Sequence, residues 1–145
     1  MYLVVVMDLF NSGIKGWDIS DSMEAKHTVT AFINAIRGLQ GRAKNVIFHS
    51  DQGVQNCAKE LRRKLKLLGF LQSMSRKGNC YDNAFVESFF HSLKNELESR
   101  IFKTKEDARK AIFEYIETWY NNKRLHSSLG YMSPKEFEQQ FGHVA

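Results

Sequence analysis

Apolar residues recur with two different periods along this chain, and the changes of period divide its first part into strands and a helix. Residues 2–8 form an apolar, β-branched run and residues 14–19 form a second; the Asn-Ser-Gly sequence between them predicts a hairpin turn. Apolar residues then recur every three or four positions as far as Gly38, with Asp21 or Ser22 as the expected N-cap. The chain therefore opens with a predicted β-hairpin and a predicted helix.

Shorter apolar runs predict a strand, a helix and a second strand in the middle of the chain. Residues 46–48 are expected to form a short buried strand, residues 54–68 a helix with leucines inward, and residues 70–74 another strand. Gly69 lies where that helix should end. Together with the hairpin, this order of elements predicts an α/β fold.

Polar caps mark three helices in the last part of the chain. Asp82 is expected to cap a helix that reaches about Arg100, and Thr104 a helix that reaches about Asn121. Ser133, which is followed by proline at the first helical position, should start a last short helix. The C-terminal part is therefore predicted to be mainly helical.

Length and composition favour one globular domain. The chain has 145 residues, 43% of them hydrophobic, which is enough for a sizeable core, and it contains no repeat or low-complexity segment. We expect a single domain over residues 1–145, in which residues 120–145 form a C-terminal segment that packs on the rest.

Charge and apolar content restrict the partners and the compartment. The formal charge of +5 fits an anionic partner such as DNA. Cys57 and Cys80 follow no paired spacing and are expected to be free thiols in a reducing compartment. No apolar run approaches the roughly 18 residues of a membrane span, and no export signal is recognisable. We therefore expect a cytoplasmic protein.

Two acids stand out by their surroundings. Asp51 follows the predicted strand at 46–48 and opens a turn that contains Gly53, whereas Glu87 lies where a polar loop runs into a helix. There are 35 residues between the two acids. Acids presented by a strand end and a helix can converge on divalent metal ions, as in two-metal phosphoryl transfer. The competing interpretations are a turn-forming aspartate and a solvated helix glutamate.

Several stretches carry a resemblance to a known family: residues 2–10 with 14–17, the sequence His49-Ser50-Asp51-Gln52-Gly53, residues 74–89, and residues 120–134. On these stretches the chain resembles the DDE transposases of bacterial insertion sequences, which share the retroviral-integrase catalytic core. The resemblance implies a ribonuclease-H-like mixed sheet flanked by helices. It also implies Mg²⁺- or Mn²⁺-dependent cleavage and joining of DNA strands, with Asp51 and Glu87 as catalytic metal ligands.

The family pattern includes one more acid, on a strand upstream of the segment that residues 2–8 resemble. Because the sequence starts at Met1, we expect a truncated core that lacks its first strand, has an incomplete active site and binds metal weakly or not at all. Asp8 is the candidate third ligand, although it matches a different family position. Only 42 residues separate Asp8 from Asp51, which is fewer than the family usually shows.

Basic and polar residues near Glu87 are candidates for DNA contacts. His91 and Lys94 share the predicted helix face of Glu87. The resemblance implies a basic residue seven positions after the glutamate, where Lys94 could contact a DNA phosphate. A cationic loop before the helix offers three further candidates: Arg76, Lys77 and Asn79. Each of these side chains could instead be simply solvated. The opposite helix face is expected to pack in the core: Phe85, Phe89, Leu93 and Leu97.

Residues 120–134 are rich in aromatic and basic side chains, among them Tyr120, Arg124 and His126. Such a mixture can bind nucleic acid, or it can pack the C-terminal segment onto the core, which we favour. The basic run at residues 59–66 is more readily explained as a solvated helix face than as a DNA groove.

Three functions compete at this point. The leading one is DNA transposition, in which this chain is a catalytic-core fragment that is inactive alone. The alternative is a non-catalytic DNA-binding or dimerisation module that regulates a full-length transposase. The third is a metal-dependent nuclease that uses Asp8. Loss of the first strand further predicts either that residues 2–8 pair with residues 46–48, or that a second copy fills the gap, so we expect a homo-oligomer.

Overall fold

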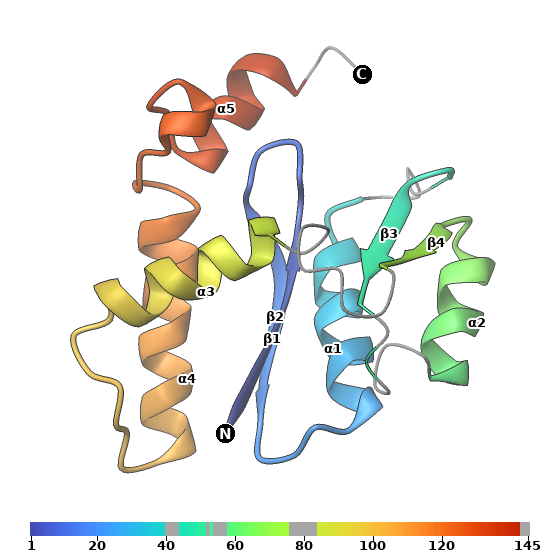
Figure 1. Ribbon diagram of the computed structural model, residues 1–145, viewed down its shortest axis with the longest axis horizontal. Coiled ribbons are helices and arrows are strands. Elements are labelled where there is room, and N and C mark those ends of the chain that lie inside the picture. Colours follow the sequence, from blue (N-terminus) through green and yellow to red (C-terminus); the bar gives the residue numbers. More distant parts are fainter. Residues whose placement is uncertain (40–43, 52, 54–57, 76–83, 143–145) are drawn as a thin grey trace. The chain divides into compact units, whose positions relative to one another are not determined.

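The computed structural model describes residues 1–39, 44–51, 53, 58–75 and 84–142, and the chain divides into two compact units (Figure 1). The first unit comprises Met1–Val6 and Lys15–Glu87, and the second comprises Met7–Ile14 and Ser88–Ala145.

Most of both strands of the predicted hairpin belongs to the first unit, and the loop that joins them belongs to the second. Strands β1 (Tyr2–Met7) and β2 (Ile14–Ser20) pair in a two-stranded sheet. The amide of Asp8 donates to the carbonyl oxygen of Gly13 at 2.9 Å, which closes the loop between the strands. The prediction of a hairpin in this part of the sequence is therefore confirmed.

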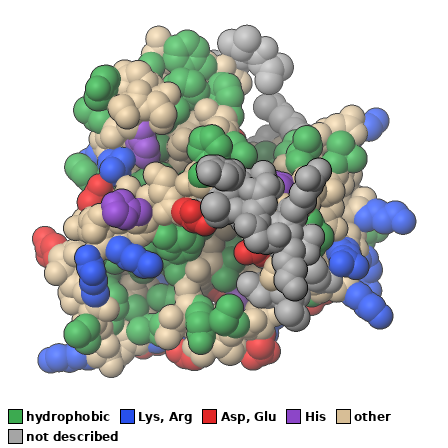
Figure 2. Space-filling view, in the orientation of Figure 1, with side chains coloured by type: hydrophobic (Ala, Val, Ile, Leu, Met, Phe, Trp, Pro, Cys, Tyr) green, Lys and Arg blue, Asp and Glu red, His purple; other side chains and the backbone are tan. Residues whose placement is uncertain are grey.

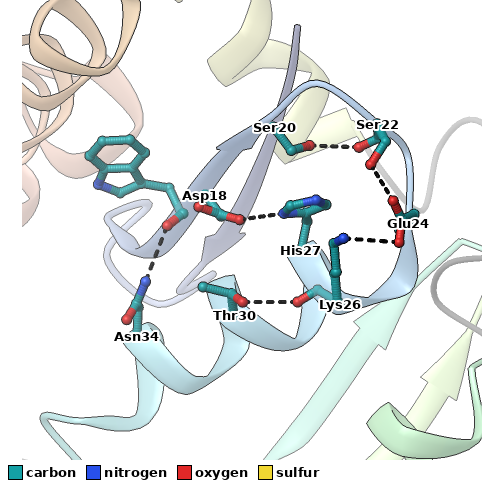
Figure 3. A network of polar contacts seen from close by, with 9 residues as sticks. Asp18, Ser20, Ser22, Glu24, Lys26, His27, Thr30 and Asn34 are labelled. Carbon is teal, nitrogen blue, oxygen red and sulfur yellow. Dashed lines mark hydrogen bonds and ion pairs between the residues drawn. The ribbon is translucent and has the colours of Figure 1, made fainter. Parts of the chain in front are cut away.

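Helix α1 (Ala25–Ile36) starts later than the sequence suggested. Its N-cap is Glu24, whose side chain makes no capping hydrogen bond, so the predicted cap at Asp21 or Ser22 is wrong. The hydroxyl of Ser22 instead donates to the Glu24 carboxylate at 2.8 Å (Figure 3). The connection from β2 to α1 thus uses this serine to hold its own turn rather than to begin the helix.

A strand, a helix and a strand follow, as predicted. Strand β3 (Ile47–Ser50) pairs in parallel with β4 (Leu71–Met74), and α2 (Lys59–Leu67) belongs to the connection between them. Parallel neighbours need such a crossover because a tight turn cannot reverse the chain twice. The core between the helices and this sheet consists of Val29, Phe32, Leu61 and Leu65, against which Ile33, Ile36, Phe48 and Phe70 pack.

One prediction about the sheet is wrong. The strand expected to be buried at residues 46–48 is partly exposed: Ile47 is 65% exposed, and Leu71 opposite it is 52% exposed. In addition, the described strands form two separate two-stranded sheets, so β1 does not pair with β3, and the other alternative, a second copy that fills the gap, stays a prediction. Each strand pairs instead with its nearest neighbour in sequence, which requires only a short loop or a single crossover.

The second unit is helical, and its helix ends follow the sequence signals. Thr104 accepts a hydrogen bond from the Asp107 amide, and Ser133 forms a capping box with Glu136. Two boundaries differ: the helix predicted to reach about Arg100 ends at Glu96, and the helix predicted to reach Asn121 changes to a π-helix for its last seven residues. The predicted N-cap Asp82 lies outside the described residues. The helical elements are α3 (Ala84–Glu96), α4 (Lys105–Phe113), η3 (Glu114–Tyr120), the 3₁₀ turn η4 (Ser127–Leu129) and α5 (Pro134–Phe141).

Aromatic side chains join α3 to η3 in the second unit. The Phe89 ring lies 4.9 Å from Tyr120 in an edge-to-face arrangement and 6.3 Å from Tyr115, and Leu93 is buried one turn further along α3. Phe85, which we predicted to be in the core, is 55% exposed. The buried stripe of α3 begins one turn later, because Phe89 is the first of its residues to meet the aromatic rings of η3.

A carboxylate at the end of α3 accepts hydrogen bonds from three side chains. Glu96 accepts hydrogen bonds from the Tyr115 hydroxyl at 2.8 Å, the Trp119 indole at 3.1 Å and the Arg124 guanidinium at 2.8 Å. Burial raises the pKa of Glu96, but these three donors lower it by more, so the net pKa lies below its ordinary value. The ionised carboxylate therefore links α3, η3 and the segment that follows them.

The hairpin tip belongs to the second unit and is held by the C-terminal segment. The side-chain amide of Asn121 donates to the Ile14 carbonyl and accepts from the Ile14 amide, both at 2.9 Å. The rings of Phe10 and Phe137 lie 5.2 Å apart. This double contact explains why residues far apart in sequence form one compact unit.

Gly16 provides a test of the packing of β2 on α1. A Cβ atom at Gly16 would overlap the Ala31 carbonyl oxygen and lie 2.8 Å from the Ala35 Cβ. We expect Gly16→Ala to lower the free energy of unfolding by about 2–3 kcal/mol, because backbone must move. Gly38→Ala is the control: nothing lies within 4 Å of its Cβ position, so stability should stay constant or rise by up to about 1 kcal/mol. Equal urea midpoints for the two variants would contradict this packing.

Glu96 should contribute stability in a pH-dependent way. Its folded pKa is lowered, so its contribution is complete above the unfolded carboxyl pKa and disappears as the pH falls through the folded value. We expect Glu96→Gln to cost about 1–2 kcal/mol at pH 7, and this difference from wild type to shrink towards about pH 3. Urea titrations over this range measure it. Glu98→Gln removes another exposed carboxylate of this unit and should leave the midpoint at pH 7 unchanged.

Candidate functional site

Asp51 directly follows β3, and the local hydrogen bonds fix its position. The amide and the hydroxyl of Ser75 both donate to the Ser50 carbonyl, at 2.9 and 3.3 Å, which anchors the strand one residue before Asp51. A side-chain oxygen of Asp51 accepts from the Gly53 amide at 2.9 Å. The residue is exposed. Its carboxylate therefore lies at the carboxyl end of two parallel strands, where ligands of open α/β sheets usually bind.

Buried polar atoms accompany this strand end. One ring nitrogen of His49 lies 3.0 Å from the Ser73 hydroxyl. The other ring nitrogen, Nε2, and the hydroxyl of Ser50 are buried and have no hydrogen-bond partner in the described part of the chain. Such atoms are costly to leave unpaired, so they indicate a place where a further polar group or a water molecule completes the structure.

Glu87 lies in the first turn of α3 and is exposed. A carboxylate in a first turn is stabilised by the amide groups that point out of the helix start. Asp51 and Glu87 both belong to the first unit. Both offer hard oxygen donors that suit Mg²⁺, which needs few carboxylates and keeps waters or phosphate oxygens as other ligands. Within the described residues, no three His, Cys, Asp or Glu side chains gather in a group that could hold a metal ion.

Asp8, the candidate third ligand, lies in the hairpin loop. Its carboxylate accepts a hydrogen bond from the Phe10 amide at 2.9 Å. It belongs to the second unit, whereas Asp51 and Glu87 belong to the first. The described contacts of Asp8 are those of a turn residue, and a role for it as a ligand stays a prediction.

The face of α3 that carries Glu87 is exposed, as its spacing predicted. His91 and Lys94 are exposed with it, while Phe89 and Leu93 are buried on the other side of the helix. A ring nitrogen of His91 lies 2.9 Å from the Asn95 side-chain amide. Lys94 has no ion pair or hydrogen bond to another described side chain. The predicted loop residues Arg76, Lys77 and Asn79 lie outside the described residues.

Most of the aromatic and basic side chains named above in residues 120–134 pack against one another and are not fully exposed. Tyr120 is buried, with the Arg124 guanidinium 5.9 Å and the His126 ring 4.9 Å from its ring centre. Burial lowers the pKa of His126, and the nearby Arg124 lowers it further, so this ring is neutral at pH 7. Tyr131 differs, because it is 72% exposed. The packing interpretation therefore holds for three of these four side chains.

Basic side chains also gather over α2, where Figure 2 shows Lys and Arg at the right-hand edge of the view. They are the exposed residues Lys59, Arg62, Arg63 and Lys66. The buried face of the same helix consists of Leu61 and Leu65. This arrangement is that of an amphipathic surface helix, as the sequence predicted.

A polar contact between a histidine and an aspartate, which links β2 to α1, was not predicted from the sequence. The His27 ring nitrogen Nδ1 lies 2.7 Å from the Asp18 carboxylate, and both side chains are largely buried (Figure 3). Thr30 and Asn34 extend this polar side of α1, with Asn34 donating to the Trp17 carbonyl. The only available signal was an aspartate at an inward position of the predicted strand, which by itself did not indicate a partner nine residues later.

Comparisons with known proteins identify the chain's relatives. Two models of the integrase core domain match it, one over residues 1–80 and one over residues 68–134. The transposase for insertion sequence element IS904 of Lactococcus lactis subsp. lactis is 44% identical over 96% of this chain and 55% of that protein. Transposase InsF for insertion sequence IS3A of Escherichia coli K12 is 43% identical over 97% of this chain and 49% of that protein. The chain thus spans about half the length of these relatives.

Solved structures agree on the fold. The catalytic core domain of BIV integrase matches with a TM-score of 0.67 at 18% identity, over 98% of this chain and 88% of that one. A chain of the simian T-cell lymphotropic virus intasome in complex with PP2A regulatory subunit B56 gamma matches with a TM-score of 0.65 at 15% identity, over 86% of this chain and 43% of that one. The ribonuclease-H-like fold expected from the sequence is therefore confirmed. No helix within the described ranges is long and apolar enough to cross a membrane.

The matched domain models, the transposase relatives and the shared fold agree with one another. The chain belongs to the integrase core domain family, with the transposases of bacterial insertion sequences among its relatives.

Proposed function

We propose that this chain is part of the catalytic core of a DNA transposase, and that Asp51 and Glu87 are ligands for divalent metal ions. The observation that carries the proposal is the placement of two exposed carboxylates, one at the end of β3 and one at the start of α3. Family membership supports it, as do the relatives reported above, which are transposases of insertion sequences.

The chain's own residues fix the position of the Asp51 carboxylate. The Gly53 amide orients the Asp51 carboxylate, and the paired end of β3 limits the movement of its backbone. When bound, a metal pair would supply activation of the attacking oxygen and stabilisation of the leaving oxygen at a phosphodiester. Lys94, two helical turns after Glu87 on the same exposed face, would contact a phosphate and position the DNA backbone.

The donor chemistry fits a divalent metal, but the described residues supply fewer ligands than such a site needs. No group of three candidate ligands is present among them. We therefore propose that a further acidic ligand comes from outside the described residues. We also propose that the 145-residue chain, which spans about half the length of its transposase relatives, binds metal weakly and transfers strands negligibly when it is alone. The buried, unpaired atoms of His49 and Ser50 support a site that another segment completes.

A second candidate function is a non-catalytic module that binds DNA or dimerises and thereby regulates a full-length transposase. The observation that favours it is the division of the strands into two small sheets with apolar residues exposed on β3 and β4. Exposed apolar strands promote association, so a homo-oligomer would follow from the same feature.

Metal binding tests the two carboxylates. We expect Mn²⁺, followed by electron paramagnetic resonance, to bind the chain weakly, and Asp51→Asn or Glu87→Gln to weaken binding by about tenfold or more, because each removes one charged ligand. Asp107→Asn, an exposed acid on α4, is the matched control and should bind as wild type does. Robust Mg²⁺-dependent nicking of plasmid by this chain, abolished by Asp8→Asn, would instead establish Asp8 as a catalytic ligand.

Lys94 gives a test of DNA binding. If Lys94 contacts a phosphate, Lys94→Ala should weaken the binding of DNA duplexes of different sequence by similar factors. The slope of log K against the logarithm of the salt concentration should fall by the amount that corresponds to about one phosphate contact. Fluorescence anisotropy at several salt concentrations measures both. Lys135→Ala, an exposed lysine of α5 in the same unit, is the control. An unchanged salt slope for Lys94→Ala would show that this lysine is only solvated.

A further inference from the structure

The second unit contains a pocket that the proposed DNA chemistry does not use. Its volume is about 510 Å³, and it lies between the end of α3, the loop after α3, and the helix formed by α4 and η3. Six of its lining residues carry the argument: Glu96, Glu98, Phe102, Glu114, Tyr115 and Trp119. All of them belong to the second unit.

The charge of this pocket is opposite to that of the chain. Its lining contains three glutamates and, among the described residues that form it, no lysine or arginine, although the whole chain carries a formal charge of +5. Glu96 is engaged by Arg124, Tyr115 and Trp119. Glu98 and Glu114 are exposed, and their side-chain carboxylates make no hydrogen bond or ion pair to another described residue. Two carboxylates are therefore available to a ligand.

Aromatic rings form another part of the pocket wall. The indole of Trp119 is 45% exposed, yet its N–H donates to Glu96 at 3.1 Å, so the ring is held in place with surface open to solvent. Tyr115 is buried and fixed by the same carboxylate at 2.8 Å. A rigid aromatic face beside free carboxylates is a favourable environment for a cation.

The backbone on one side of the pocket has an unusual form. Glu114, Tyr115 and Trp119 all lie in the π-helical segment η3, where the Asn121 amide bonds to the carbonyl of Ile116, five residues earlier, at 3.0 Å. This spacing brings Glu114 and Trp119, also five residues apart, to the same side of the helix, and both line the pocket. Segments of π-helix are rare and occur frequently at functional sites.

We propose that this pocket binds an arginine side chain of a polypeptide partner, with the guanidinium stacked on Trp119 and paired with Glu98 and Glu114. Arginine fits better than lysine because its planar group can stack on an indole while it donates several hydrogen bonds to carboxylates. DNA does not fit, because three carboxylates would repel its phosphates. The chain would then have a protein-binding pocket in addition to the residues assigned to DNA.

A titration followed by NMR tests this with the 145-residue chain. The probe is acetyl-Gly-Arg-Gly-amide, and the readout is the indole N–H signal of Trp119, with that of Trp17 as internal reference. We expect a saturable shift of the Trp119 signal, a weaker effect of the lysine peptide and none of the glutamine peptide. Glu98→Gln with Glu114→Gln should raise the Kd about fivefold, as expected for two exposed ion pairs. Glu106→Gln, an exposed acid of α4 outside the pocket lining, should leave it unchanged.

Several results would overturn the proposal. An equal shift with the glutamine peptide would indicate a site that is only apolar. The absence of a shift with the arginine peptide up to about 50 mM would mean that binding is too weak to matter. A shift of the Trp119 signal by duplex DNA would show that the pocket accepts nucleic acid. If sedimentation shows a dimer for the wild-type chain and a monomer for the double glutamate variant, the pocket binds a second copy of this chain instead.

Discussion

The position of the proposed catalytic strand depends on one aromatic side chain, Phe32 of α1. Its ring is 1% exposed and meets Phe48 of β3 at 5.4 Å and Phe70, just before β4, at 5.1 Å, both edge-to-face. Edge-to-face pairs add to the free energy of burying the rings and also fix their relative orientation. Through these two contacts a single helix residue holds both parallel strands, and Asp51 lies at the end of the first of them.

Hydrogen bonds then fix the positions of individual groups on the strands that the aromatic packing holds in place. The paired end of β3 fixes the backbone before Asp51, and the Gly53 amide holds the carboxylate itself. In the second unit, Glu96 has a comparable role, because its three donors come from η3 and from the segment that follows it. Glu96 is thus used for structure, while Asp51 is the carboxylate that we propose as a metal ligand. Their surroundings differ: Asp51 is exposed and accepts from the Gly53 amide, whereas Glu96 meets an arginine, a tyrosine and a tryptophan.

Much of the fold followed from local signals in the sequence. The hairpin, the parallel strands with their crossover helix, and the caps at Thr104 and Ser133 were predictable because each depends on residues close together in the chain. The exposure of Ile47 and Phe85 was not predictable, since it depends on which distant elements cover them. The donors to Glu96 were missed for the same reason: they lie 19 to 28 residues away, and no periodic pattern connects them. Local sequence predicted that Asp51 follows a strand and that Glu87 lies near the start of a helix. A shared metal site, in contrast, requires a contact between two residues with 35 others between them in the sequence.

The most direct test of the central claim is a crystal structure of the chain soaked with Mn²⁺ and measured at the manganese absorption edge. The account predicts an anomalous peak in contact with carboxylate oxygens of both Asp51 and Glu87, at about 2.0–2.3 Å as expected for a small divalent cation with oxygen ligands. Partial occupancy would be consistent with a site that lacks one ligand. Carboxylates of Asp51 and Glu87 on separate faces of the molecule, with manganese bound to neither or to only one, would contradict the assignment of a transposase metal site to these residues.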